Sequence, residues 1–286
     1  MLTESSFDTG AVVLNYAEGP PSGAPLVVLH GGSASWRYWQ DLLIALAPRW
    51  HVYAPDLRGH GGSGHVPARY LLADYAADIA AFLDRGVGAP AVLFGHSLGG
   101  EVAVMVAARH PARVRALIVG DAPLSSDHHA TEDPVHREMN VLWHALSSSG
   151  QTIEEIAAAL REMAVVMEGG ATRSAAEIFG GDSPWFHFQA ENLHRLDPDM
   201  LAAVLEGPHQ MLAGYDPAVL LPAITCPVLL LQAEQGSAMG EQDVALARTL
   251  LGDVTCLRLA GADHPLGTER VVAASKAFLQ RIAAED

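Results

Sequence analysis

One serine of this chain has the surroundings that nucleophilic chemistry requires. Residues 95–99 read Gly-His-Ser-Leu-Gly, between a short apolar run at 91–94 and an amphipathic segment at 98–110. These flanks predict a strand, a sharp turn and a helix, the context in which G-x-S-x-G exposes a serine hydroxyl. The two glycines allow neighbouring backbone to pass close to the strained turn. The pattern therefore predicts that Ser97 is a nucleophile.

A serine hydroxyl is a weak nucleophile at neutral pH and needs a base. Among 14 histidines, His264 is the strongest candidate, because it follows the last predicted strand, 254–259. A loop at that position belongs to the same sheet edge as Ser97. His96 adjoins Ser97 but should point away from it, so we expect a structural role. The histidines between residues 123 and 222 do not follow strands, and most should have no chemical role.

Acyl transfer also needs hydrogen-bond donors for the developing oxyanion. The sequence His-Gly-Gly-Ser at residues 30–33 follows a predicted strand. The backbone N–H groups of Gly32 and Leu98 are the expected donors. Gly32 could instead belong only to a tight turn, although its position relative to Ser97 favours the oxyanion role. We expect Ser33 and Trp36 to line the substrate pocket.

These residues need a sheet that brings strand ends together, and the hydrophobic pattern predicts one. Seven short runs rich in Val, Leu and Ile read as strands, most of them buried and parallel. They are residues 11–16, 25–30, 50–55, 91–94, 114–119, 227–231 and 254–259. Amphipathic helices are predicted at 72–85, 98–110, 241–251 and 269–284. The alternation predicts an α/β fold with a mostly parallel sheet of about eight strands flanked by helices.

The alternation breaks once, between residues 123 and 222, where the pattern is helical and contains no strand-like run. We interpret 123–222 as a helical cap inserted after the sixth strand, and 1–122 with 223–286 as the core domain. Large apolar side chains are frequent in the cap. Most should pack its own core, while Trp143 and Trp185 are candidates for lining an apolar pocket that faces the sheet.

Composition narrows the classes of partner. The chain has 286 residues and a formal net charge of −16, which argues against binding to nucleic acid or anionic membranes. Residues 1–8 lack the features of a signal peptide, and no apolar stretch is long enough to cross a bilayer. Cys226 and Cys256 have no metal-ligand spacing, and we expect them to be reduced. We expect a soluble cytoplasmic protein that acts on a small molecule, and a homodimer is left open.

Together these features resemble the α/β-hydrolase superfamily, and in particular its capped serine esterase and haloperoxidase-like branch. The resemblance rests on four segments: residues 30–32, 54–63, 95–100 and 263–264. It implies a triad of serine, histidine and acid that includes Ser97 and His264, with no metal and no organic cofactor. Haloalkane dehalogenases and epoxide hydrolases of the superfamily use an aspartate nucleophile, so the serine at position 97 disfavours both activities.

The sequence departs from the family pattern at the acid. Most members carry an aspartate shortly after the seventh strand, where this chain has Gly236. Some members place their acid at the end of the sixth strand, which here supplies Asp121. We favour Asp121 and keep Glu234 as the alternative acid.

The predicted function is hydrolysis of a carboxylic ester, a lactone or a thioester of modest size and apolar character. The same triad could instead hydrolyse a carbon–carbon bond in a diketone-like substrate, and the motifs do not separate the two reactions. A ligand receptor with little turnover is a third hypothesis, against which the Ser97 and His264 pair argues.

Overall fold

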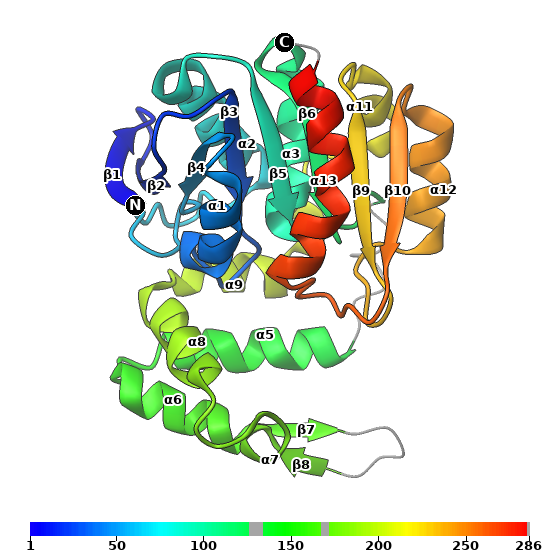
Figure 1. Cartoon of the computed structure of the whole chain (residues 1–286). Helices are drawn as coiled ribbons and strands as arrows, with labels where there is room; N and C mark the ends of the chain where they lie inside the picture. The colour runs from blue at the N-terminus through cyan, green and yellow to red at the C-terminus, as the bar shows by residue number, and fades with distance from the viewer. Residues whose placement is uncertain (126–133, 167–171, 285–286) are drawn as a thin grey trace.

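The structure is a computed structural model that describes residues 1–125, 134–166 and 172–284. Its centre is an eight-stranded sheet with the order β1-β2-β4-β3-β5-β6-β9-β10 (Figure 1). The strands are β1 (Thr3–Asp8), β2 (Val13–Glu18), β3 (Pro25–Leu29), β4 (His51–Pro55), β5 (Ala91–His96), β6 (Val114–Gly120), β9 (Val228–Ala233) and β10 (Val254–Leu259). The pairs from β4 to β10 are parallel, and only the pairs that β2 makes are antiparallel. The predicted fold class is therefore confirmed.

The apolar strands are buried on both faces because their side chains alternate between two cores. In β3, Val27 and Leu29 face one hydrophobic cluster, while Leu26 and Val28 face the other. No strand pattern was recognised for β1, whose side chains are mostly exposed at the edge of the sheet. A strand with so little buried surface carries no hydrophobic run that the sequence could reveal.

Helices cover both faces of the sheet. One core packs α1 (Gln40–Leu46) and α13 (Thr268–Ala284), together with the 3-10 helix Trp36–Trp39. The opposite core packs α2 (Leu72–Ala81), α3 (Leu98–Arg109) and α12 (Glu241–Leu250). A π-helical turn (Phe82–Val87) extends α2, and a 3-10 turn (Pro111–Arg113) leads into β6. Because β3, β5, β6, β9 and β10 run parallel, their carboxyl ends all lie at the same edge of the sheet.

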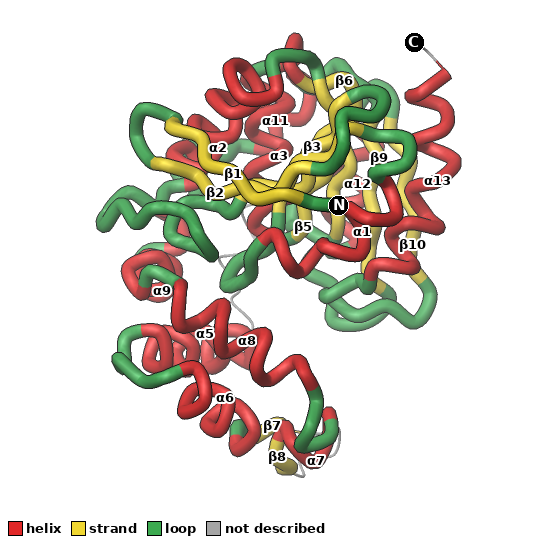
Figure 2. The backbone as a smooth tube through the Cα atoms, turned by 60° about the vertical axis from the view of Figure 1, so that its left-hand side comes forward, coloured by secondary structure: helices red, strands yellow, loops and turns green. Residues whose placement is uncertain are grey.

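The cap lies beyond that edge, below the sheet in Figure 1 and in the turned view of Figure 2. It contains α5 (Pro134–Ser147), α6 (Ile153–Glu162), β7 (Ala164–Val166), β8 (Thr172–Ser174), α7 (Ala175–Phe179), α8 (Pro184–Arg195), α9 (Pro198–Glu206) and α10 (Pro208–Met211). These elements lie between β6 and β9 in the chain, within the range interpreted as a cap from the sequence.

Two features of the cap differ from the sequence interpretation. The strands β7 and β8 form a small antiparallel pair inside a stretch predicted to be entirely helical. They are three residues each, too short to produce a periodic signal. In addition, α11 (Pro217–Ala223) packs on α3 and buries Leu220 and Leu221 in the core. The last residues of the range predicted as the cap therefore belong to a helix that packs on α3.

The two cysteines are free and partly buried. Cys256 pairs with Leu230 in the register of β9 and β10, whereas Cys226 precedes β9. The two side chains are thus offset along neighbouring strands and do not form a disulfide. Burial raises the pKa of Cys226 to about 11, so this thiol stays protonated at neutral pH. Among the residues that the structure describes, every helix is too short or too polar to span a bilayer.

Candidate active site

The turn between β5 and α3 holds Ser97 in a backbone conformation that is rare for a residue with a side chain. Its φ is 52° and its ψ is −123°. A Cβ on Gly95 would come within 2.1 Å of the Gly99 carbonyl oxygen, and a Cβ on Gly99 would come within 2.5 Å of the His30 carbonyl oxygen. Only glycine fits at either position, which is the steric reason for the G-x-S-x-G pattern. The strained turn presents the Ser97 hydroxyl to the pocket at the carboxyl edge of the sheet.

Three side chains from three loops at this edge form a hydrogen-bonded chain. His264, between β10 and α13, has its Nε2 3.2 Å from the Ser97 Oγ. Its Nδ1 lies 2.7 Å from Oδ2 of Asp121, which directly follows β6. The charged acceptor Asp121 favours the tautomer with hydrogen on Nδ1, which leaves Nε2 free to accept the Ser97 proton. The structure thus brings together the predicted nucleophile, base and acid.

Asp121 is fully buried, and its oxygens are surrounded by donors. Oδ1 accepts hydrogen bonds from the Ala233 N–H at 2.9 Å and from the Ser237 hydroxyl. Oδ2 accepts from the Ala238 N–H at 3.0 Å and from His264. Burial alone raises the pKa of Asp121, but the hydrogen bonds from His264, Ala233 and Ser237 outweigh it and hold that pKa below its ordinary value. The carboxylate is therefore ionised at neutral pH.

The alternative acid, Glu234, does not meet His264. Its side chain is exposed, and its Oε2 accepts a hydrogen bond from the Gly261 N–H at 2.8 Å. Gly236, where family members carry their acid, is exposed with a φ of 53°. The loop around it supplies hydrogen bonds to Asp121 through Ser237 and Ala238 instead of supplying the acid. The role of Ser237 was missed, because one serine beside a glycine has no distinguishing sequence signal.

The predicted oxyanion donors come from two segments: Gly32 follows β3, and Leu98 directly follows Ser97. Leu98 is the first residue of α3, so its N–H has no acceptor within the helix. Neither the Gly32 N–H nor the Leu98 N–H bonds to an acceptor in the described part of the chain, and both residues line the pocket. The His30 ring braces the Gly32 loop, since its Nδ1 is 2.7 Å from the Gly31 carbonyl oxygen and its Nε2 accepts from the Leu57 N–H at 2.9 Å.

A cavity of about 660 Å³ lies between the triad and the cap. Three cap helices line it with side chains one helical turn apart: Met139 and Trp143 on α5, Trp185 and Gln189 on α8, and Met200 and Val204 on α9. Trp143, Trp185 and Ser33, which the sequence analysis named as candidates for a substrate pocket, lie in the lining of this cavity. The lining is mainly apolar, and Ser97 and His264 lie on the core side of the cavity.

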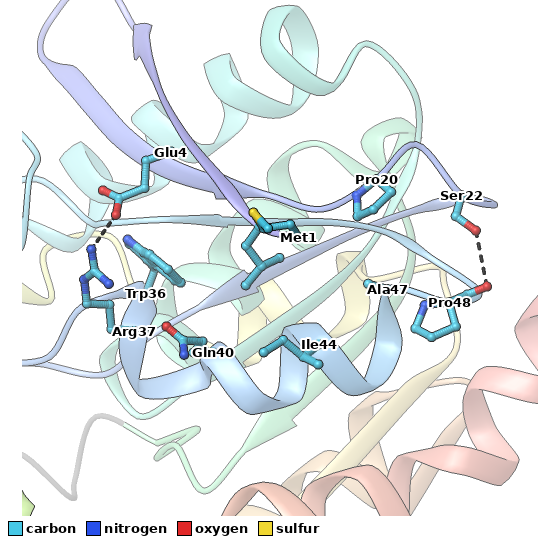
Figure 3. Close-up of a pocket in the computed structure, with 11 residues that line it drawn as sticks. Met1, Glu4, Pro20, Ser22, Trp36, Arg37, Gln40, Ile44, Ala47 and Pro48 are labelled. Carbon is cyan, nitrogen blue, oxygen red and sulfur yellow. Dashed lines mark hydrogen bonds and ion pairs between the residues drawn. The ribbon is translucent and has the colours of Figure 1, made fainter.

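Trp36, also predicted to line the substrate pocket, does not line this cavity. Its backbone N–H donates to Asp56 Oδ1 at 2.7 Å, and this bond anchors the start of the 3-10 helix. The indole lies instead in a second hollow of about 920 Å³, between the N-terminal strand and α1, with Arg37 stacked on its ring (Figure 3). Proximity to residues 30–33 in sequence suggested the pocket, but the direction of the side chain depends on the helix start.

Other polar side chains line the cavity without having been predicted. Gln189 donates from its Nε2 to the Ser33 carbonyl oxygen at 3.2 Å, which ties α8 of the cap to the oxyanion loop. Glu101 and Tyr38 also line the cavity. These contacts join segments far apart in the chain, and a single sequence contains no signal for them. Among the described residues, no group of three or more His, Cys, Asp or Glu side chains could hold a metal ion.

Three buried histidines around the site make stability depend on pH. Burial lowers the pKa of His30 to about 4, and burial together with the charge of a neighbouring histidine lowers the pKa values of His60 and His96 to about 3. In the unfolded chain each would take up a proton near its ordinary pKa of about 6.5. Below that pH the unfolded chain binds more protons, so the free energy of unfolding falls until the folded-state pKa values are reached.

When the contributions of the three histidines add, we expect the free energy of unfolding to fall by up to about 4 kcal/mol for each pH unit. Urea denaturation at a series of pH values between about 7 and 5 measures it. The variant His187→Gln, at an exposed histidine, should show the same pH dependence as the wild type. A free energy of unfolding that is constant over this range would contradict the prediction.

Comparison with known proteins agrees with this architecture. Residues 24–146 match the profile of the alpha/beta hydrolase fold family. The chain is 27% identical over 264 residues to 2-(acetamidomethylene)succinate hydrolase of Mesorhizobium japonicum. The aligned region covers 90% of this chain and 87% of that protein. It is 38% identical over 109 residues to the lipase LipV of Mycobacterium tuberculosis, a match that spans 38% of this chain and only 41% of the lipase.

The three-dimensional likeness extends over nearly the whole chain. An esterase from Thermogutta terrifontis, solved with malate bound, superposes with a TM-score of 0.72 at 23% identity, covering 98% of this chain and 99% of the esterase. At that identity the likeness establishes the fold. With the profile match over residues 24–146 and the eight-stranded sheet, it shows that the chain has the α/β-hydrolase fold.

Proposed function

We propose that the protein is a serine hydrolase that cleaves carboxylic esters, lactones or thioesters of small to medium apolar substrates. The observation that carries the proposal is the continuous hydrogen-bonded chain from Ser97 through His264 to Asp121, with the His264 Nε2 3.2 Å from the Ser97 Oγ. A nucleophile, its base and a group that orients the base are the three parts that acyl transfer requires.

In the proposed mechanism, Ser97 attacks the acyl carbon while His264 Nε2 removes the hydroxyl proton. The N–H groups of Gly32 and Leu98 bind the oxyanion of the tetrahedral intermediate. His264 then gives its proton to the leaving alcohol, and the acyl group remains on Ser97. Water, deprotonated by His264, attacks this acyl-enzyme; the bond to Ser97 Oγ breaks, His264 returns the proton to that oxygen, and the carboxylic acid is released. Asp121 stays ionised, fixes the imidazole tautomer and stabilises the imidazolium in both half-reactions.

The cavity supports an apolar substrate of limited size. Its volume of about 660 Å³ is in the range of small-molecule sites, and Met139, Trp143, Trp185 and Met200 contribute large apolar side chains to it. The named relatives include a lipase and an esterase, which supports ester cleavage. No observation on the described residues favours cleavage of a carbon–carbon bond or a receptor role over this reaction.

A panel of 4-nitrophenyl esters tests the proposal. We expect turnover to rise from acetate to butanoate and octanoate, since each buried methylene adds about 0.8 kcal/mol of binding, and to fall for dodecanoate once the cavity is full. A burst of nitrophenol equal to the enzyme concentration should precede the steady state if deacylation is slower than acylation. Matched lactones and thioesters extend the panel. Absence of turnover on every member would contradict the proposed function.

A further inference from the structure

The loop that carries His264 is held by side chains from two other parts of the chain. Between β10 and α13 this loop lacks regular secondary structure, and Leu266 has a φ of 38°. The His96 Nε2 lies 2.8 Å from the His264 carbonyl oxygen. The Tyr38 hydroxyl lies 2.5 Å from the Pro265 carbonyl oxygen. Two consecutive carbonyl groups of the loop therefore accept hydrogen bonds from distant side chains.

The two donors also pack on each other. The rings of Tyr38 and His96 are stacked, with centroids 6.0 Å apart and planes 7° from parallel. The Trp39 and His96 rings are nearly perpendicular, with centroids 5.6 Å apart, and the centroids of the His264 and His96 rings are 4.9 Å apart. Only 6% of His96 is exposed, so its ring cannot reorient without disturbing these neighbours.

Both donors keep the protons that these bonds require. A carbonyl oxygen only accepts, so the hydrogen of His96 must be on Nε2. Burial and the nearby charge of His264 lower the pKa of His96 to about 3, so its ring remains neutral. Burial raises the pKa of Tyr38 to about 12, and its hydroxyl stays protonated. The two hydrogen bonds are thus present across the neutral pH range.

We infer that Tyr38 and His96, here called the loop clamp, are positioning residues that hold the His264 imidazole at its working distance from Ser97. This inference rests on the proposed function. His96 is the last residue of β5 and adjoins Ser97, so the strand end that presents the nucleophile also holds the loop of the base. Displacing a catalytic group by a fraction of an ångström slows the chemical step more than it weakens substrate binding.

The first test removes one hydroxyl. In Tyr38→Phe the ring can still stack on His96, but the Pro265 carbonyl loses its donor. We expect kcat on a 4-nitrophenyl ester to fall roughly threefold to tenfold, the range for one hydrogen bond, with KM unchanged. Inactivation by a fluorophosphonate should slow by the same factor. Tyr53→Phe is the matched control, because that hydroxyl contacts His51 and lies away from the cavity.

The second test separates positioning from packing at His96. Glutamine can offer an amide N–H near the place of the imidazole Nε2, whereas leucine fills the space without a donor. We expect His96→Leu to lower kcat and His96→Gln to recover a large part of the loss. Equal kcat in the two variants would overturn the role of this hydrogen bond, and wild-type kcat in Tyr38→Phe would overturn that of the hydroxyl.

The tests also separate the loop clamp from the proposed function. If the wild-type protein neither reacts with the fluorophosphonate nor hydrolyses any ester, the proposed function fails and the loop clamp fails with it. If the wild type does both, and Tyr38→Phe and His96→Leu match it in kcat, KM and inactivation rate, the loop clamp alone is wrong. A fall in kcat with a constant KM, together with rescue by glutamine, supports both.

Discussion

If the proposed function holds, replacing Ser97 by alanine is expected to abolish hydrolysis, with kcat falling on the order of a millionfold, as in a serine protease that loses its nucleophile. The Ser97 hydroxyl is the group that would form the acyl-enzyme. Alanine has no hydroxyl proton that His264 Nε2, which lies 3.2 Å from the Ser97 Oγ, could remove. The substitution removes one oxygen atom, so the fold should remain. The steady-state rate on the best 4-nitrophenyl ester measures the effect.

Covalent labelling gives a second measurement that does not depend on the natural substrate. A fluorophosphonate should add to the wild-type protein once per chain, and peptide mapping should find it on Ser97. Ser97→Ala should not be labelled, while the exposed-site control Ser148→Ala should be labelled at the wild-type rate. Labelling of Ser97→Ala at the wild-type rate would show that another residue is the nucleophile.

The second large effect is expected for Asp121→Asn, with a loss in kcat on the order of ten-thousandfold. Asparagine keeps the size of the side chain but brings an amide group to where Oδ1 and Oδ2 accept from Ala233, Ser237, Ala238 and His264. The amide can favour the wrong tautomer of His264 and cannot stabilise the imidazolium. The rate on an ester substrate and the rate of fluorophosphonate labelling should fall together.

Glu234→Gln is the control that separates the two candidate acids. Because Glu234 is exposed and its carboxylate bonds only to the Gly261 N–H among the contacts described, we expect kcat within about twofold of the wild type. The reverse outcome, with Asp121→Asn active and Glu234→Gln inactive, would refute the assignment of Asp121.

Asp121→Asn should also change stability in a pH-dependent way. The folded-state pKa of Asp121 lies below its ordinary value, so its ionised form stabilises the fold above that ordinary value. This contribution is lost as the pH falls through the folded-state pKa. The variant should therefore have a lower melting temperature than the wild type at neutral pH, and the difference should shrink in acid.

The nucleophile and the sheet could be predicted because their signals are local. Ser97 is recognisable from five consecutive residues and the runs on each side of them, since the steric demands of the turn act on Gly95 and Gly99 themselves. The buried strands are continuous apolar runs because both of their faces are covered. In contrast, β1 is mostly exposed, and β7 and β8 are only three residues long each. Such strands form because a neighbouring strand pairs with them, and their own sequences contain no hydrophobic pattern that predicts them.

The acid was only partly determined by the sequence. Asp121 and Glu234 both follow strands that end at the correct edge, and the sequence left both open. The tertiary structure selects Asp121 because the loop after β9 turns Ser237 and Ala238 toward it, while Glu234 bonds to Gly261 at the surface. The direction of a side chain at a strand end depends on loop conformation, which propensity and periodicity do not encode.

By itself, the sequence of this protein determined the α/β-hydrolase architecture, the strained turn at Ser97 and the position of His264 on a loop at the same edge of the sheet. These features depend on the order of the elements along the chain and on the backbone conformations that glycine and serine can adopt. Only the tertiary structure decided which carboxylate meets His264, that Trp36 faces away from the cavity, and that Tyr38 and His96 hold the loop of the base. Each of these contacts joins residues from separate elements, and it exists only where packing of the whole core fixes both partners.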